Sequence, residues 1–214
     1  MNEFAEALQV RPGLTAIIGG GGKTTLLYRL ARELEGRGSV IVTTSTHIFK
    51  PTDLPFALTA GKVSGILCVG MPCENGKLSA PQQSFRELTA LADYVLVEAD
   101  GSAGRPLKAH ASHEPVIPRE ANQVICVVGA SGLNHPAAEK VHRPERFMAL
   151  SGSDTAAPEA VAAVLNKEAL HTRVLINQAD SPERIAAARE LARLLNCPVV
   201  VASLQKGEII ICVY

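Results

Sequence analysis

The stretch Leu14-Thr-Ala-Ile-Ile18 runs directly into Gly19-Gly-Gly-Gly22 and then into Lys23-Thr24-Thr25, and this stretch decides the fold. The short apolar run predicts a buried strand, and the helical period after it predicts a helix. Glycines between them have no Cβ, so their N–H groups can turn toward an anion at the helix N-terminus. The order strand, glycine-rich turn, Lys-Thr and helix is the context that a phosphate-binding loop requires.

In such a loop Lys23 reaches the β- and γ-phosphates, and the Thr24 hydroxyl binds Mg²⁺. The full pattern G-x-x-x-x-G-K-[ST] has a glycine where this chain has Ile17. A plain glycine-rich turn beside an exposed lysine is the structural alternative. We expect a nucleotide to contact the loop residues Gly19, Gly20, Gly21, Gly22, Lys23, Thr24 and Thr25.

Apolar runs rich in β-branched residues alternate with helix-period segments along the rest of the chain. Strands are expected at 14–18, 40–45, 94–99, 123–128, 173–177 and 198–202, and helices at 24–35, 82–91 and 182–195. This alternation predicts an α/β fold, a P-loop NTPase-like three-layer sandwich with a mostly parallel central sheet. A chain of 214 residues is long enough for one domain, so residues 1–214 are expected to form a single nucleotide-binding domain.

Two decorations of that domain are expected. Residues of about 62–80 predict an inserted hairpin that pairs 66–69 with 77–80, and residues of about 137–170 predict a small helical cap with helices at 143–150 and 158–165. The segment 101–119 is too rich in proline for a helix and too long for a simple connection, which is typical of a functional loop.

Acidic residues stand where the third predicted strand ends, in Val97-Glu98-Ala99-Asp100-Gly101. This segment resembles the D-x-x-G of GTPases, and Glu98 is expected to hold the Mg²⁺ hydration shell together with Thr24. Asp100 is the candidate for orienting a water or an acceptor hydroxyl, and Lys23, Glu98 and Asp100 form the expected catalytic set. Either acid could instead cap the next turn.

Hydroxyl side chains follow the second predicted strand, at the sheet edge where doubly wound proteins bind ligands. Thr44 and Thr46 are candidates for contact with phosphate or substrate there, although threonine is also an ordinary strand residue.

Asn177-Gln178-Ala179-Asp180 is close to the N-K-x-D by which GTPases read guanine. A carboxylate at Asp180 can accept hydrogen bonds from guanine N1–H and its amino group, a donor pair that adenine lacks. Ser203 lies in a segment resembling the one that completes guanine pockets. GTP is therefore preferred over ATP, and an Asx turn before a Ser181-capped helix is the structural alternative.

The charge balance of 21 basic and 21 acidic residues, net zero, argues against nucleic acid or an anionic membrane as a partner. The N-terminal segment lacks a basic region and a long apolar region, which predicts no secretory signal. Five irregularly spaced cysteines fit reduced thiols, so a cytoplasmic location is expected.

The segments 18–25, 41–48, 95–118 and 174–180 together resemble the YqeC family, described as accessory proteins of selenium-dependent hydroxylases. The run from Glu98 to Pro118 is the most specific part. The resemblance implies a P-loop nucleotide-binding protein linked to maturation of molybdenum-containing hydroxylases in a selenium-related step. It also places Lys108 and Glu114 among the candidates near the phosphates.

Three hypotheses follow from these patterns. The first is an Mg²⁺-dependent NTPase whose partner is a molybdenum hydroxylase or one of its maturation proteins. The second is a small-molecule kinase or ligase on the same fold, and the third is a non-hydrolysing nucleotide-dependent scaffold. A homodimer is an open alternative by analogy with related P-loop folds.

Overall fold

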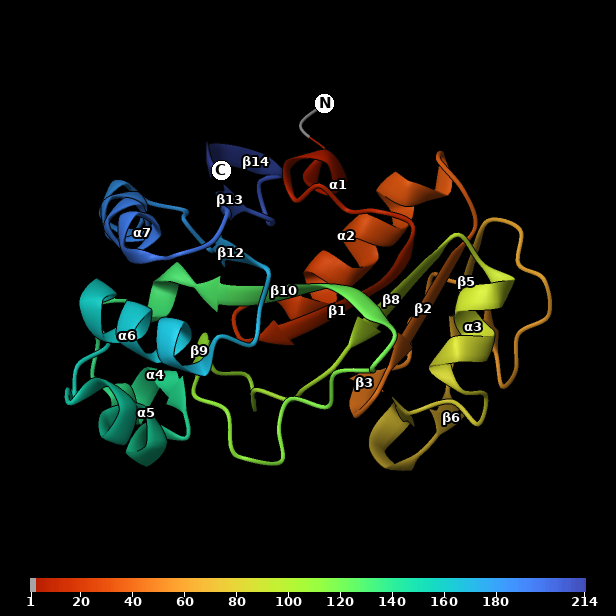
Figure 1. The fold of residues 1–214 in the computed structure, drawn as a ribbon, viewed down its shortest axis with the longest axis horizontal. Helices are drawn as coiled ribbons and strands as arrows, with labels where there is room; N and C mark the ends of the chain where they lie inside the picture. Colours follow the sequence, from red (N-terminus) through yellow and green to blue (C-terminus); the bar gives the residue numbers. More distant parts are fainter. Residues whose placement is uncertain (1–2) are drawn as a thin grey trace.

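A computed structural model describes residues 3–214, which fold around a nine-stranded sheet in the order β14-β13-β12-β10-β1-β8-β2-β5-β4 (Figure 1). Neighbouring strands are parallel except for the antiparallel pair β13–β14. The strands are β1 Gly13–Gly19, β2 Val40–Thr44, β4 Phe56–Ala57, β5 Ile66–Val69, β8 Tyr94–Glu98, β10 Ala121–Gly129, β12 Arg173–Asn177, β13 Val199–Ser203 and β14 Glu208–Val213. The predicted α/β fold with a mostly parallel sheet is confirmed.

Helices cover both faces of this sheet. The short helix α1 (Phe4–Ala7) and helix α2 (Lys23–Glu35) lie on one face, where Ile17 of β1 joins the α2 leucines in one buried cluster. Helices α3 (Phe85–Leu91), α6 (Pro158–Glu168) and α7 (Pro182–Leu194) cover the other face. Successive strand residues point to opposite faces, so the apolar run of β1 supplies both layers.

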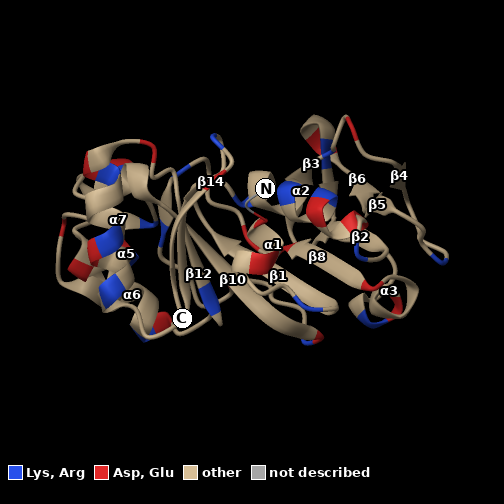
Figure 2. Cartoon of the chain, turned by 90° about the horizontal axis from the view of Figure 1, so that it is seen from above, with Lys and Arg blue, Asp and Glu red and all other residues tan. Residues whose placement is uncertain are grey.

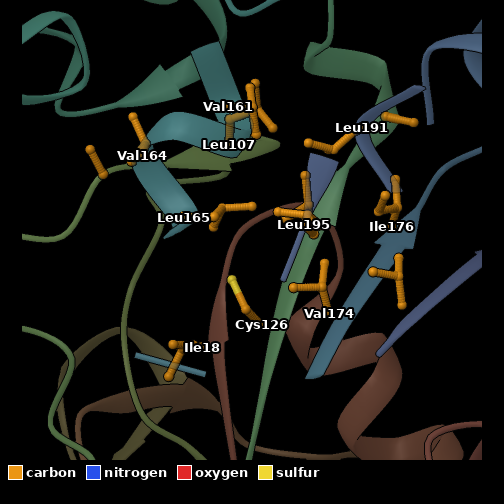
Figure 3. Close-up of a cluster of buried hydrophobic side chains, with 14 of the residues drawn as sticks. Ile18, Leu107, Cys126, Val161, Val164, Leu165, Val174, Ile176, Leu191 and Leu195 are labelled. Atoms are coloured by element: carbon orange, nitrogen blue, oxygen red, sulfur yellow. The ribbon is translucent and has the colours of Figure 1, made fainter. Parts of the chain in front are cut away.

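The second face is filled by aliphatic side chains, as Figure 3 shows. Ile18, Cys126 and Val174 of the sheet meet Val161, Val164 and Leu165 of α6 and Leu191 of α7, and all of these are buried. Burial of each large aliphatic side chain contributes about 1.5–3 kcal/mol. Figure 2 shows β1, β8 and β10 mostly without charged residues, which gather on helices and connections.

The hairpin predicted for 66–69 and 77–80 is wrong. Strand β5 pairs in parallel with β2 in the central sheet, whereas β7 (Lys77–Ser79) pairs with β3 (His47–Phe49) and β6 (Met71–Pro72) in a separate small sheet. The two strands are joined by β6 and the 3₁₀ turn Glu74–Gly76. A strand of three or four residues carries no local signal for its neighbour, so its pairing is chosen by tertiary contacts.

Helix α3 begins three residues later than expected. Ser84 caps it by accepting a hydrogen bond from the Glu87 N–H, and the Glu87 carboxylate accepts one in return from the Ser84 N–H. This capping box ends the irregular segment before Phe85.

The helical cap is built from α4 (Ala137–Lys140), α5 (Pro144–Ser151) and α6, which lie together at one end of the molecule in Figure 1. The proline-rich segment 101–119 is tied to it, because strand β9 (Leu107–Lys108) pairs with β11 (Val141–His142). This pairing places the segment between the sheet edge and the cap. None of the described helices combines the length and the apolar character needed to cross a bilayer.

Candidate nucleotide-binding site

The glycine-rich turn joins β1 directly to α2. Gly21 has φ +77°, and a Cβ there would lie 2.5 Å from the Cα of Gly129, so glycine is required on steric and backbone grounds. A Cβ on Gly20 would lie 2.6 Å from the carbonyl oxygen of Arg105 in the proline-rich segment. The turn is therefore held closely between β10 and that segment.

The loop N–H groups divide into two sets. Gly19 donates to the Asp100 carboxylate at 2.9 Å, and Gly20 donates to the Val127 carbonyl at 2.8 Å. The N–H groups of Gly21, Gly22, Lys23 and Thr24 have no acceptor within residues 3–214. The amides available to an anion are thus those nearest the helix, where the helix dipole also favours negative charge.

Lys23 is the first residue of α2 and is 5% exposed. Its ammonium donates to the Gly19 carbonyl at 2.7 Å, and it lies 3.2 Å from Asp100 Oδ1 and 3.9 Å from Glu98 Oε1. The lysine therefore bends back over the loop, where it is held by two carboxylates.

Thr24 and Glu98 are in direct contact, since the Thr24 hydroxyl donates to Glu98 Oε2 at 2.7 Å. Burial raises the pKa of Glu98, an effect that Lys23 and the Thr24 hydrogen bond only partly offset. A hydroxyl and a carboxylate oxygen are hard donors that suit a hydrated Mg²⁺, which keeps several of its waters. This pair fits the metal expected from the sequence.

Asp100 lies fully buried behind the loop. Its Oδ2 accepts the Gly19 N–H and lies 3.2 Å from Lys108 Nζ and 2.9 Å from His110 Nε2. Burial alone would raise the pKa of this carboxyl, but His110, the two lysines and the Gly19 amide outweigh burial and lower it. Asp100 is thus an ionised carboxylate surrounded by cations.

Two chains of charged contacts lead outward from Asp100. Lys108 also contacts Glu114 at 3.0 Å, and Glu114 contacts Arg143 at 2.9 Å. Burial tends to raise the pKa of Glu114, but the hydrogen bonds from Lys108 and Arg143 lower it overall. In the second chain His110 contacts Glu168, the last residue of α6. No sequence pattern distinguished Glu168.

A cavity of about 390 Å³ lies over the loop. It is lined by residues 21–25, Glu98, strand β3, Lys77, residues 101–105 and Gln178. The loop, Thr24 and Glu98 therefore share one space, whereas Asp100 lies outside its lining.

A second cavity of about 670 Å³ adjoins the first and shares His47, Lys77 and Gly101 with it. Thr46 and Glu114 line this second space. Thr44 lies deeper, and its hydroxyl donates to the Glu98 carbonyl at 2.8 Å, joining the ends of β2 and β8. The two threonines predicted as ligand contacts thus occupy different places.

Asn177, at the end of β12, holds the glycine-rich turn in place. Its amide donates to the Gly21 carbonyl at 2.7 Å, and its side-chain oxygen accepts the Leu204 N–H at 2.9 Å. The loop after β13 and the glycine-rich turn are therefore linked through one side chain. Gln178 follows with φ +63° and lines the cavity over the loop.

Asp180 and Ser203 lie outside the lining of both cavities. Asp180 Oδ2 is 3.5 Å from an Arg184 nitrogen, and its buried Oδ1 has no hydrogen-bond partner within residues 3–214. Ser203 is buried and accepts the Lys206 N–H at 3.1 Å. The Ser181 cap predicted for α7 is present, since its hydroxyl accepts from the Arg184 N–H.

The part of the chain that the structure describes holds no group of three or more His, Cys, Asp or Glu side chains arranged for a metal ion. A bound Mg²⁺ would therefore depend on Thr24, Glu98, waters and phosphate oxygens together.

The fold and the strand-loop-helix unit define an α/β protein with a P-loop NTPase-like sandwich. Residues 15–145, more than half of the chain, match a family model described as "YqeC protein". A relative from Escherichia coli K12, "Uncharacterized protein YqeC", is 37% identical over 166 residues, which are 67% of this chain and 62% of the relative. The chain belongs to the YqeC family, and this match spans less than two thirds of the relative's length.

Proposed function

We propose that this protein binds a nucleoside triphosphate with Mg²⁺, prefers GTP, hydrolyses it, and assists the maturation of a molybdenum- or selenium-dependent hydroxylase. The observation that carries the proposal is the convergence of the free loop amides, Lys23, Thr24 and Glu98 on one cavity. The amides and Lys23 supply positive charge for the phosphate oxygens, and Thr24 and Glu98 supply hard oxygen atoms for the metal.

The residues of this chain have separate tasks. The amides of 21–24 receive phosphate oxygens, and the Lys23 ammonium moves from Asp100 to the β- and γ-phosphates. Thr24 and Glu98 hold the metal, which when bound neutralises charge on the transferring phosphoryl group. Glu98, at the border of the cavity, orders the water shell there.

Preference for GTP is supported by the segment Asn177 to Asp180. Asn177 links the phosphate loop to the segment after β13, and the Asp180 Oδ1 acceptor is buried without a partner within the described residues. An unpaired acceptor is stabilised by a ligand that donates to it, and guanine offers a carboxylate the adjacent N1–H and amino donors, a pair that adenine lacks. ATP is the competing nucleotide.

The role in hydroxylase maturation is supported by the family resemblance alone. In this role nucleotide binding or hydrolysis drives delivery of a metal, selenium or cofactor component to the target enzyme. A maturation protein or the hydroxylase itself is the proposed partner.

The second cavity favours one alternative, a small-molecule kinase or ligase. Its lining shares Gly101 with the cavity over the loop, so a molecule bound there would adjoin the space proposed for the triphosphate. Hydroxyl and charged groups line it, which suits a polar acceptor.

Titration of GTP and ATP with and without Mg²⁺, followed by phosphate release on the preferred nucleotide, tests the proposal. Binding with acceptor-free phosphate release supports the hydrolase, and release that needs a small-molecule acceptor supports the kinase or ligase. Tight binding without turnover, even with candidate partner proteins, supports a scaffold. Failure to bind either nucleotide overturns all three.

A further inference from the structure

We propose that His110 and Glu168 are positioning residues that compensate the Asp100 carboxylate and so make Lys23 available to the phosphates of the nucleotide. The inference rests on the proposed nucleotide site and adds two residues from outside its cavity. Neither residue contacts the space over the loop.

Lys23 faces a competition between two anions. In the structure its ammonium lies 3.2 Å from Asp100 Oδ1, and a triphosphate on the loop amides would attract the same ammonium. Asp100 is fully buried, so water and salt screen its charge weakly. Positive charge from other groups near Asp100 therefore reduces the free energy that is lost when the Lys23 ammonium leaves this carboxylate.

His110 supplies such charge. Its Nε2 lies 2.9 Å from Asp100 Oδ2, while its Nδ1 lies 2.6 Å from Glu168 Oε2. When both carboxyl groups are ionised they can only accept hydrogen bonds, so each ring nitrogen then donates and the ring is an imidazolium. Burial by itself would lower the pKa of His110, but the hydrogen bonds to Asp100 and Glu168 outweigh burial and raise it.

Glu168 holds this arrangement with both carboxylate oxygens. Oε2 contacts His110 Nδ1, and Oε1 accepts the His110 backbone N–H at 2.7 Å. The two contacts fix the ring plane and favour its charged form. Replacement of Glu168 by glutamine keeps the shape and removes the charge that stabilises the imidazolium.

Two series of charged contacts connect the helical cap to the glycine-rich loop: one runs through Glu168 and His110, and the other runs through Arg143. Glu168 ends α6, and Arg143, the residue before α5, reaches Asp100 through Glu114 and Lys108. Both routes converge on the carboxylate that binds Lys23 and the Gly19 amide. The charge balance behind the loop is therefore set in part by the cap.

A double-mutant cycle distinguishes the positioning role of Glu168 from a purely structural one. A structural role predicts the same loss of GTP affinity whether or not Lys23 is present. The test measures GTP affinity in the presence of Mg²⁺ for Glu168→Gln in the natural background and in the Lys23→Ala background. A fluorescent GTP analogue, used over a range that covers weak binding, gives all four affinities. Thermal unfolding of each variant checks folding.

We expect Glu168→Gln to weaken GTP binding by about three- to tenfold with Lys23 present, and by less than about twofold with Lys23 absent. Glu159→Gln, an identical change at an exposed position of the same helix, should alter neither affinity. His110→Gln, which retains a donor toward Asp100 without the charge, should repeat the result if Glu168→Gln does not fold.

Equal loss of GTP affinity in both backgrounds would overturn the positioning role and leave the proposed nucleotide site intact. No loss in either background would overturn it as well. Absence of GTP and ATP binding by the natural protein would instead overturn the proposed function, and this inference with it.

Discussion

The side-chain amide of Asn177 donates a 2.7 Å hydrogen bond to the carbonyl oxygen of Gly21, across 156 positions of sequence. The same side chain accepts the Leu204 N–H, so it joins the glycine-rich turn to the segment after β13. The segments expected to contact phosphate and base are thereby held in one arrangement before any ligand binds. Such preorganisation reduces the ordering cost of binding.

Asn177→Ala removes both hydrogen bonds and leaves buried backbone groups without partners. We expect the free energy of unfolding in urea to fall by about 1–3 kcal/mol and the affinities for GTP and ATP to fall together. Asn166→Ala is the matched control, since Asn166 also bonds two backbone groups, at Leu194 and Asn196, far from the loop. The control should lose stability only. Undiminished nucleotide affinity in Asn177→Ala would show that the brace has no part in binding.

Lys23→Ala removes the proposed charged contact to the phosphates, worth about 1.5–3 kcal/mol, so triphosphate affinity should fall by roughly ten- to hundredfold. Calorimetric titration measures the loss. Lys62→Ala changes the same residue type at an exposed position and should bind as the natural protein does. If Lys23→Ala binds with unchanged affinity, the phosphate-loop assignment is discarded.

Glu98→Gln removes the charge proposed to attract the hydrated metal but retains an acceptor for the Thr24 hydroxyl. We expect Mg²⁺-dependent turnover to fall at least tenfold, while nucleotide binding without metal changes little. Glu208→Gln, at an exposed position of β14, serves as control. Phosphate release measured across a range of Mg²⁺ concentrations separates the two effects, and unaffected release would mean that another acid holds the metal.

Asp180→Asn replaces an acceptor-only carboxylate by an amide. The ratio of GTP to ATP affinity should fall by about tenfold, mainly through loss of GTP binding, because the amide cannot accept both guanine donors. Competition between the two nucleotides measures the ratio, and Asp154→Asn at an exposed site should leave it unchanged. Equal affinity of the natural protein for GTP and ATP would remove the basis of this prediction.

His110 makes stability depend on pH. Because the pKa of His110 in the folded state lies above its ordinary value of 6.5, its stabilising contribution is complete below pH 6.5 and is lost as pH rises through the folded pKa. The pKa of Asp100 is lowered from 3.8, so its contribution is present above 3.8 and is lost as pH falls through the folded pKa.

His110 contacts Asp100 and Glu168, and Lys108 contacts the same Asp100 oxygen. Glu114, Arg146 and Lys167 line one cavity with His110, and His171 acts on it at longer range. Burial lowers the pKa of His171, so protonation of that ring below pH 6.5 destabilises the fold. The difference in urea stability between the natural protein and His110→Gln removes the part of this effect that comes from burial of His171, and keeps the part that comes from the charge of His110. That difference should shrink as pH rises above 6.5, and a difference that is constant from pH 6 to pH 9 would contradict the charged state of His110.

Several elements were predictable because their signals are local. The strand Arg173–Asn177 has the predicted bounds, and the Ser181 cap of α7 stands where the Ser-Pro pair indicated. A strand end, a cap and a left-handed glycine each depend on the dihedral angles of a few consecutive residues. Those angles are restricted by residue type.

The pairing of 77–79 was not predictable in the same way, and neither was the role of Glu168. Three residues of strand carry no information on which partner they meet, and Glu168 has the composition of an ordinary helix end. Their positions follow from how the cap packs against the sheet. Contacts between distant segments decide them.

By itself, the sequence determined that this protein has a strand, a glycine-rich turn and a helix in direct succession, since hydrophobic period and glycine content act within a few residues. Only the tertiary structure decided that Asp100 lies buried behind the turn, that two loop amides already have acceptors, and that Glu168 completes the charge balance. The reason is physical: the environment of a buried charge depends on which distant groups the fold brings within a few ångströms of it.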